Sequence, residues 1–136
     1  KVDRSAAYAT RHVAKNLVAA GVADEVLVQI AYAIGVAEPI SIYVNTYGTS
    51  HVDLEDSEIS EKIYKIFSLT PRAIINQFNL KAPIYTPTSA YGHMGRNTEK
   101  SIYRLINNGL SIEKAVRFFP WEELDYVDKI KSQFNI

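Results

Sequence analysis

The sequence has no cysteine, only one methionine and one tryptophan, and no excess of either sign of charge. Without cysteine there is neither a disulfide framework nor a thiolate metal site, which indicates a reducing compartment, and we expect the cytoplasm. Fifteen basic residues balance fifteen acidic ones, so the positive surface typical of nucleic-acid or anionic-membrane binders is not expected. The longest strongly apolar stretch, residues 26–34, falls far short of the ~20 residues that span a bilayer. We therefore expect a soluble protein with no nucleic-acid or membrane partner.

With 136 residues, the chain can form one domain that buries about two-thirds of its unfolded surface. Apolar residues recur every three or four positions over residues 4–20, which predicts an amphipathic helix. Period-two alternation over residues 25–33 and 40–45 predicts two strands that pair as an antiparallel hairpin. The sequence thus predicts a helix lying on a hairpin.

The remaining pattern is mostly helical. We expect a helix over residues 57–67 with Ser57 as its cap, and a second helix from Thr70 to about Phe78. Prolines and glycines over residues 80–96 predict an irregular surface segment.

Beyond Arg96 we expect three further helices. One is capped by Asn97 or Thr98 and ends at Gly109, one is capped by Ser111, and the last begins at Pro120. Because an isolated two-stranded hairpin is marginal in water, at least one more strand is also expected.

Three stretches, at residues 1–9 (KVDRSAAYA), 33–39 (AIGVAEP) and 90–96 (AYGHMGR), carry a family resemblance, which resumes at residues 119–122 (FPWE). Together they resemble the C-terminal third of S-adenosylmethionine synthetases, also called methionine adenosyltransferases. The resemblance implies an α+β fold, a two-layer sandwich with helices on one face of a mainly antiparallel sheet. It also implies that residues 1–136 are one domain lacking its first strand and the family's glycine-rich loop, so the chain alone is not expected to be active.

The resemblance implies a reaction and a set of site residues. Family members make S-adenosylmethionine, phosphate and diphosphate from ATP, L-methionine and water, in homodimers or homotetramers with active sites between subunits. Lys1 matches the catalytic lysine that faces the ATP phosphates, and Asp3 matches a carboxylate near the phosphates and their metal ions. Ile34 matches a residue that packs on the adenine ring. Mg²⁺ and K⁺ are the implied cofactors, with their main ligands outside this chain and any metal ligand within it unknown.

Plainer interpretations of these residues stay open. Asp3 could be a simple helix N-cap with Lys1 free in solvent, and Ile34 could be an ordinary core residue. We assign Glu38, which precedes a proline in a turn, a structural role. His12, His51 and His93 lack the spacing of a metal site, and we expect none of them to be catalytic.

A different class of function also fits the pattern. The chain could be a non-catalytic α/β module that binds a partner protein through the apolar face of its sheet. Residues between Arg96 and Phe119 have no counterpart in many family members, and no functional residue is inherited there. An assay of methionine-dependent phosphate release distinguishes the two hypotheses, because the enzyme should show this activity and the module should not.

Overall fold

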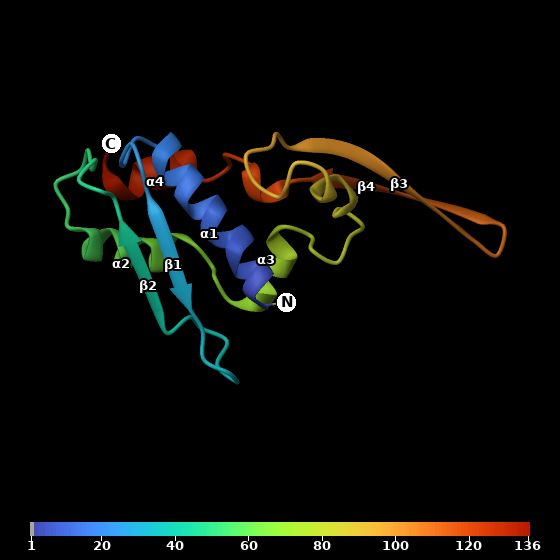
Figure 1. Cartoon of the computed structure of the whole chain (residues 1–136), viewed down its shortest axis with the longest axis horizontal. Helices are drawn as coiled ribbons and strands as arrows, with labels where there is room; N and C mark the ends of the chain where they lie inside the picture. The colour runs from blue at the N-terminus through green and yellow to red at the C-terminus, as the bar shows by residue number, and fades with distance from the viewer. Residues whose placement is uncertain (1) are drawn as a thin grey trace.

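The computed structural model describes residues 2–136, and Lys1 lies outside the described residues. The chain forms a packed body and a long two-stranded arm, β3–β4, that extends away from the body (Figure 1). Within residues 2–136, the body contains four α-helices, two short 3₁₀-helices and the hairpin β1–β2. The α+β class expected from the resemblance is confirmed.

Helix α1 spans Val2–Ala19 and is the central element of the body. Its buried face carries small side chains such as Ala6 and Ala9, which let the helix backbone approach the strands closely. Gly21, with φ of +87°, follows the helix and takes the left-handed conformation that ends many helices. The predicted helix is confirmed, and it begins two residues before the expected start.

Strands β1 (Leu27–Ala31) and β2 (Ser41–Asn45) form the predicted antiparallel hairpin. Val44 and Ile42 of β2 lie opposite Val28 and Ile30 of β1, and all four side chains belong to or pack against the core. Helix α1 contacts β1, and α2 contacts β2. Helices therefore cover the apolar face of this sheet, while its other face is exposed.

Two helices follow the hairpin, α2 (Asp56–Ile66) and α3 (Pro71–Gln77). The expected cap of α2 at Ser57 is wrong. Glu55 is the N-cap residue, and its backbone N–H donates to the Glu58 carboxylate at 2.8 Å. For α3 the prediction is confirmed, because the Thr70 hydroxyl accepts from the backbone N–H of Ala73 at 3.2 Å.

The segment after α3 contains only the short 3₁₀-helix η1 (Thr86–Ser89), as its prolines and glycines predicted. The predicted last helix is divided. A 3₁₀-helix, η2 (Pro120–Glu122), comes first, and α4 (Val127–Phe134) starts several residues later. Phe119 before η2 adopts a left-handed conformation with φ of +52°, and Glu123 after it is extended. These conformations prevent one continuous helix.

The two helices predicted between Asn97 and Phe118 are wrong. The chain there forms strands β3 (Glu99–Asn107) and β4 (Leu110–Phe118), paired over their whole length. The turn is Asn108-Gly109, with φ of +49° and +77°. Two successive residues with positive φ match the right-handed twist of a hairpin, and Asn-Gly is the dipeptide that tolerates them best.

The additional strands do not enlarge the first sheet. Among residues 2–136 the structure contains two separate two-stranded sheets. The second hairpin forms the arm instead, so the exposed edges of β1 and β2 remain unpaired within the described chain. None of the described helices combines the length and apolar character that crossing a bilayer requires.

Candidate functional site

A cavity of about 540 Å³ opens where three parts of the body meet. The first turn of α1 supplies Val2 and Asp3, the loop after β1 supplies Tyr32 and Ile34, and α3 supplies Pro71. Asp3 and Ile34 are thirty-one positions apart in the sequence (34 minus 3). The fold therefore brings two of the three predicted site residues to one cavity, and the third, Lys1, lies outside the described residues.

Asp3 occupies the first turn of α1 and is exposed. It is inside the helix, so the plainer interpretation of Asp3 as an N-cap is wrong. A carboxylate at this position is favoured by the partial positive charge of the helix N-terminus. The first turn of a helix also leaves backbone N–H groups without helical partners. The cavity wall at Asp3 thus carries one negative side chain on the first turn of α1.

Ile34 is fully exposed, with a relative accessibility of 107%. It is therefore no core residue. A turn fixes its position: the backbone N–H of Val36 donates to the Ala33 carbonyl at 3.1 Å, and Gly35 follows Ile34 with φ of +81°. Positive φ at the third residue of a turn favours glycine. The turn therefore holds a large apolar side chain out of the body beside the cavity.

Tyrosines anchor the loop that carries Ile34. The Tyr32 hydroxyl donates to the Leu69 carbonyl at 2.6 Å, and the Tyr64 hydroxyl donates to the Pro39 carbonyl at 3.1 Å. Burial, the negative charge of Glu38 and the nearby Tyr64 raise the pKa of Tyr32 to about 12. Tyr32 is thus a neutral hydrogen-bond donor at physiological pH. Glu38 itself is exposed beside the buried Pro39.

The described residues do not form a metal site. No group of three or more His, Cys, Asp or Glu side chains within residues 2–136 could hold a metal ion. Asp3 is the one carboxylate among the described lining residues of the cavity. Mg²⁺ takes about six oxygen ligands in octahedral geometry. Asp3 can contribute one of them, and the donor set for Mg²⁺ or K⁺ is incomplete within the described chain.

A buried carboxylate that sequence reasoning missed lies at the other side of α1. The Glu122 side chain is fully buried, accepting from Arg11 Nε at 2.9 Å and from Lys15 Nζ at 2.8 Å. The backbone N–H of Gly95 donates to it at 3.1 Å. Burial alone would raise the pKa of Glu122, but the hydrogen bonds from Arg11, Lys15 and the Gly95 backbone and the charge of Arg11 outweigh it, and the pKa is lowered.

The three histidines each hold a partner in the fold. His12 Nε2 lies 2.6 Å from an Asp125 carboxylate oxygen, and His51 Nε2 lies 2.7 Å from one of Asp24. His93 Nδ1 lies 2.8 Å from the hydroxyl of Tyr8, whose ring stacks on Trp121 with a centroid distance of 3.6 Å. His93 therefore takes part in packing and hydrogen bonding within the fold. None of the three histidines lines the cavity beside Asp3.

Known proteins resemble this chain closely. The S-adenosylmethionine synthases of Porphyromonas gingivalis and Cytophaga hutchinsonii are each 58% identical to it, over 137 and 139 aligned residues. These alignments cover the whole chain but 32% and 33% of the two relatives. The chain therefore spans about a third of the length of the curated relatives it matches.

A solved structure agrees with these relatives. The structure of an unusual S-adenosylmethionine synthetase from Campylobacter jejuni superposes with a TM-score of 0.78 at 36% identity, over 98% of this chain and 30% of that one. The family model of the S-adenosylmethionine synthetase C-terminal domain matches residues 1–104. On this evidence the chain belongs to the S-adenosylmethionine synthetase family, of which it forms the C-terminal domain.

Proposed function

We propose that this chain contributes the ATP-binding cavity of an S-adenosylmethionine synthetase, with Ile34 against the adenine ring and Lys1 and Asp3 near the phosphates. The observation that carries the proposal is that Asp3 and Ile34 line one cavity, although nothing in the local sequence requires it. Because the chain belongs to this family, we infer that the substrates are ATP and L-methionine.

The exposed Ile34 supports the adenine role. A fully exposed isoleucine leaves its apolar surface in water, and burying such a side chain contributes about 1.5–3 kcal/mol. The flat face of an adenine ring would cover it. The turn at Ala33–Val36 and the hydrogen bonds of Tyr32 and Tyr64 hold the loop in place before the ligand arrives. A loop fixed in advance lowers the ordering cost of binding.

In the proposed reaction the methionine sulfur attacks C5′ of the ribose. The C5′–O bond breaks, and its electron pair leaves with the tripolyphosphate. Water then cleaves the tripolyphosphate to phosphate and diphosphate. Negative charge grows on the bridging oxygen as the bond breaks, so an ammonium at Lys1 stabilises the transition state more than the bound substrate. Lys1 is the catalytic residue of this proposal.

Mg²⁺ and K⁺ are the cofactors that we propose for the complete enzyme. Mg²⁺ would neutralise polyphosphate charge, and the Asp3 carboxylate is the kind of hard oxygen ligand it prefers. The other ligands would come from outside this chain, because the cavity offers no second described carboxylate. We therefore assign Asp3 to phosphate binding and leave its direct contact with metal to experiment.

The proposal includes an assembly. We propose that the complete enzyme is a cytoplasmic homodimer or homotetramer with the cavity between subunits. Its walls come from the described chain only around the first turn of α1, the Ile34 loop and Pro71. A cavity this open excludes water only when another part of the enzyme covers it. The chain alone is accordingly expected to be inactive.

Removal of the lysine charge tests the catalytic role. In the complete synthetase, Lys1→Ala should lower kcat by about 10²- to 10³-fold, the cost of removing one group that stabilises leaving-group charge. Methionine-dependent release of phosphate measures it. Lys65→Ala, which removes an exposed lysine of α2, is the matched control and should retain full activity. A Lys1→Ala enzyme with wild-type kcat would remove Lys1 from the mechanism.

A second pair of variants tests the adenine contact. Ile34→Ala should raise the ATP dissociation constant about 5- to 10-fold, since it removes apolar area from the ring contact. Ile40→Ala is the control, because Ile40 is 61% exposed at the far end of the same loop and does not line the cavity. Equal ATP affinity in both variants would contradict the proposed site. If the wild-type protein showed no methionine-dependent release of phosphate, the result would favour the non-catalytic interaction module.

A further inference from the structure

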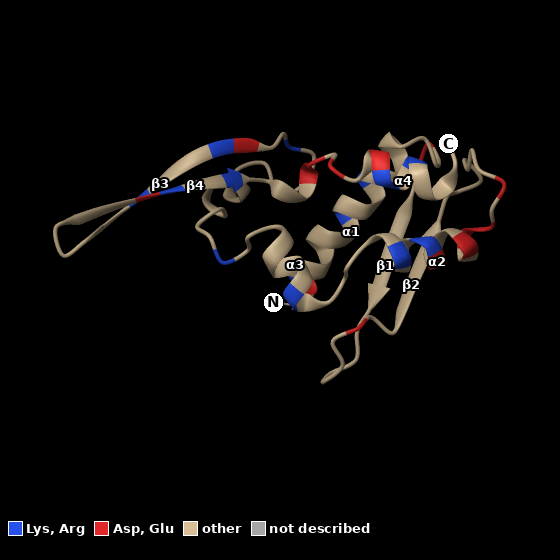
Figure 2. Ribbon diagram, turned by 180° about the vertical axis from the view of Figure 1, so that it is seen from behind, with Lys and Arg blue, Asp and Glu red and all other residues tan. Residues whose placement is uncertain are grey.

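The loop that carries Ile34 is held to the body by neutral hydrogen bonds. It runs over residues 32–40 between β1 and β2, and Glu38 is its one charged residue. Figure 2 shows it projecting from the end of the hairpin as a tan ribbon with a single red segment. One hydrogen bond is donated by Tyr32 within the loop and another by Tyr64 of α2. The two bonds hold different parts of the loop.

The Tyr32 hydrogen bond joins two walls of the candidate cavity. The Tyr32 hydroxyl donates to the Leu69 carbonyl at 2.6 Å. Tyr32 and Ile34 line the cavity from the loop, and Pro71, which follows Leu69 closely, lines it from α3. Leu69 itself is buried. The bond therefore fixes the Ile34 loop to the start of α3.

The wall formed by α3 is in turn held against α1. The two helices contact each other, and Ile74 of α3 is buried in the core. The first turn of α1 places Val2 and Asp3 in the wall of the same cavity. A loop that Tyr32 holds to α3 therefore keeps Ile34 at a fixed place relative to Asp3.

The Tyr64 hydrogen bond holds a more distant part of the loop. Its hydroxyl donates to the Pro39 carbonyl at 3.1 Å, and Pro39 is not among the described residues that line the cavity. Tyr64 is 43% exposed, whereas Tyr32 is half-buried. Burial is the main reason why the pKa of Tyr32 is raised to about 12, so its hydroxyl keeps the donated proton at neutral pH. Of the two bonds, the one from Tyr32 is shorter and lies closer to the cavity.

We propose that Tyr32 is a positioning residue for ATP, whose hydrogen bond to Leu69 sets the spacing of the cavity walls and acts on the adenine ring through Ile34. The inference rests on the proposed function, because it needs the ring at Ile34. Without the bond the loop samples other positions, and the apparent affinity for ATP falls with the fraction that presents Ile34 correctly. A contact made equally with the substrate and the transition state changes KM and not kcat.

Removal of the hydroxyl alone tests the inference in the complete synthetase. Tyr32→Phe keeps the ring and its packing. It should raise the KM for ATP about 3- to 10-fold, the effect of one neutral hydrogen bond, and leave kcat within about 2-fold of wild type. Tyr64→Phe should raise the KM less. The Val36 amide, which donates to the Ala33 carbonyl in the turn of the loop, should exchange its hydrogen faster in Tyr32→Phe than in the wild type.

Tyr85→Phe is the matched control. The Tyr85 hydroxyl also donates to a leucine carbonyl, that of Leu80, but Tyr85 is not among the described residues that line the candidate cavity. Its loss removes the same kind of hydrogen bond and should leave the KM for ATP unchanged. An equal rise in KM for Tyr85→Phe and Tyr32→Phe would overturn the inference.

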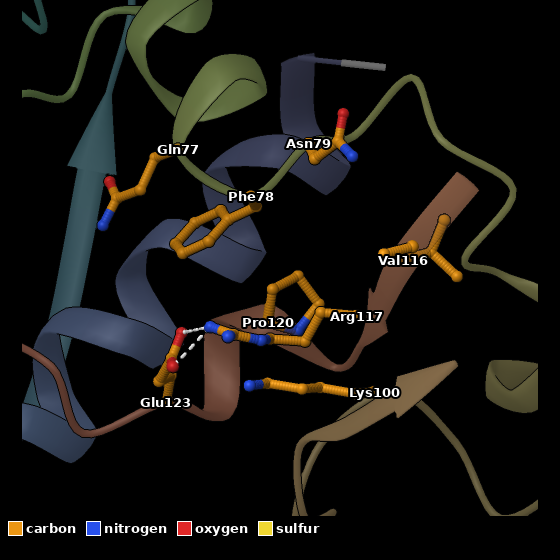
Figure 3. Close-up of a pocket in the computed structure, with 9 residues that line it drawn as sticks. Gln77, Phe78, Asn79, Lys100, Val116, Arg117, Pro120 and Glu123 are labelled. Carbon is orange, nitrogen blue, oxygen red and sulfur yellow. Dashed lines mark hydrogen bonds and ion pairs between the residues drawn. The ribbon is translucent and has the colours of Figure 1, made fainter. Parts of the chain in front are cut away.

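A second control comes from another cavity, of about 400 Å³, at the root of the arm (Figure 3). Arg117 and Glu123 line it, and the guanidinium donates to both carboxylate oxygens. This ion pair also joins two segments, β4 and the residues after η2. Arg117→Gln breaks it and should affect the stability of the fold, measured by urea unfolding, but not the KM for ATP. A KM raised as much as in Tyr32→Phe would show that it reports general loss of stability, and would overturn the inference.

A double variant distinguishes positioning from an independent contact. Because Tyr32 acts through Ile34, the KM of Ile34→Ala/Tyr32→Phe should match that of Ile34→Ala within about 2-fold. Multiplication of the two single effects would overturn the inference. A wild-type KM in Tyr32→Phe beside a raised KM in Ile34→Ala would also overturn it and leave the proposed function standing. A wild-type KM in Ile34→Ala would instead contradict the proposed adenine site, and this inference with it.

Discussion

The body and the arm of this protein differ in how far their apolar side chains are buried. In the body, a core of apolar side chains is enclosed between the helices and one face of the β1–β2 sheet, and even the carboxylate of Glu122 is enclosed by Arg11 and Lys15. In the arm, Ile102, Ile106 and other aliphatic side chains face solvent. The body is therefore stabilised by its own contacts, while the arm exposes apolar surface that no other described part of this chain covers.

The polar groups show the same difference. The Arg104–Glu113 pair in the arm has a separation of 2.7 Å but side-chain exposures of 72% and 51%. The pairs of Glu122 with Arg11 and Lys15 have similar lengths around a fully buried carboxylate. Exposed ion pairs contribute about 0–1 kcal/mol, whereas breaking a buried one leaves an uncompensated charge. The burial of the charged groups, and not the distance between them, therefore determines how much each ion pair contributes to stability.

The largest expected effect is the loss of Trp121. This side chain is fully buried, stacks on Tyr8, and donates from its indole N–H to the His93 carbonyl at 2.7 Å. Trp121→Ala should lower the free energy of unfolding by about 3–5 kcal/mol, because it leaves a cavity. Urea unfolding measures it. Ile106→Ala in the arm should stay within about 0.5 kcal/mol of wild type, and equal costs would show that the two regions do not differ.

The next largest effect distinguishes the buried ion pairs of Glu122 from the exposed pair of Arg104 and Glu113. Glu122→Gln should destabilise the body by about 1.5–3 kcal/mol, since Arg11 and Lys15 lose a charged acceptor. Glu113→Gln removes the same charge from the exposed pair with Arg104 and should cost about 0–0.5 kcal/mol. Urea unfolding of both variants tests the difference. A near-neutral Glu122→Gln would mean that the buried carboxylate contributes no more than the exposed one.

A pH series sharpens the same comparison. Because the pKa of Glu122 is lowered in the folded protein, the unfolded chain binds its proton more readily. The stabilisation of the fold by the ionised Glu122 carboxylate is therefore complete at a pH well above 4.5, the ordinary pKa of a glutamate. This stabilisation is lost as the pH falls below that value. Glu122→Gln should lose less stability on acidification than the wild type. Parallel acid profiles for the two proteins would rule out this role for the carboxylate.

The smallest effect concerns the turn of the arm. Gly109 has φ of +77°, so Gly109→Ala should destabilise the hairpin by about 1 kcal/mol without changing the unfolding of the body. Hydrogen exchange of the β3 amides measures it, and Ser111→Ala in the adjoining strand is the control. Faster exchange in α1 would indicate that arm and body unfold together.

The sequence predicted the body well because its periodicities are unambiguous. Small and apolar residues repeat along α1, β1 and β2 alternate, and Thr70-Pro71 marks the start of α3. The arm was misassigned for a physical reason. Ile102, Leu105 and Ile106 have helical spacing, i, i+3 and i+4, and only the Asn108-Gly109 turn distinguishes the strand pair.

The candidate site depended on resemblance more than on pattern. No local rule connects Asp3 with Ile34, and the exposure of Ile34 follows from a turn that the sequence only hinted at through Gly35. The burial of Glu122 could not be predicted either, because its partners Arg11 and Lys15 lie more than a hundred residues earlier in the chain. Contacts of this range are decided by how helices and loops pack.

The most direct test of the proposed cavity is a crystal structure of the complete synthetase with a non-hydrolysable ATP analogue, Mg²⁺ and L-methionine. We expect the adenine ring to cover Ile34 and the polyphosphate to lie beside Lys1 and the first turn of α1. An analogue bound at full occupancy elsewhere, with Ile34 still exposed to solvent, would contradict the assignment of this cavity to ATP.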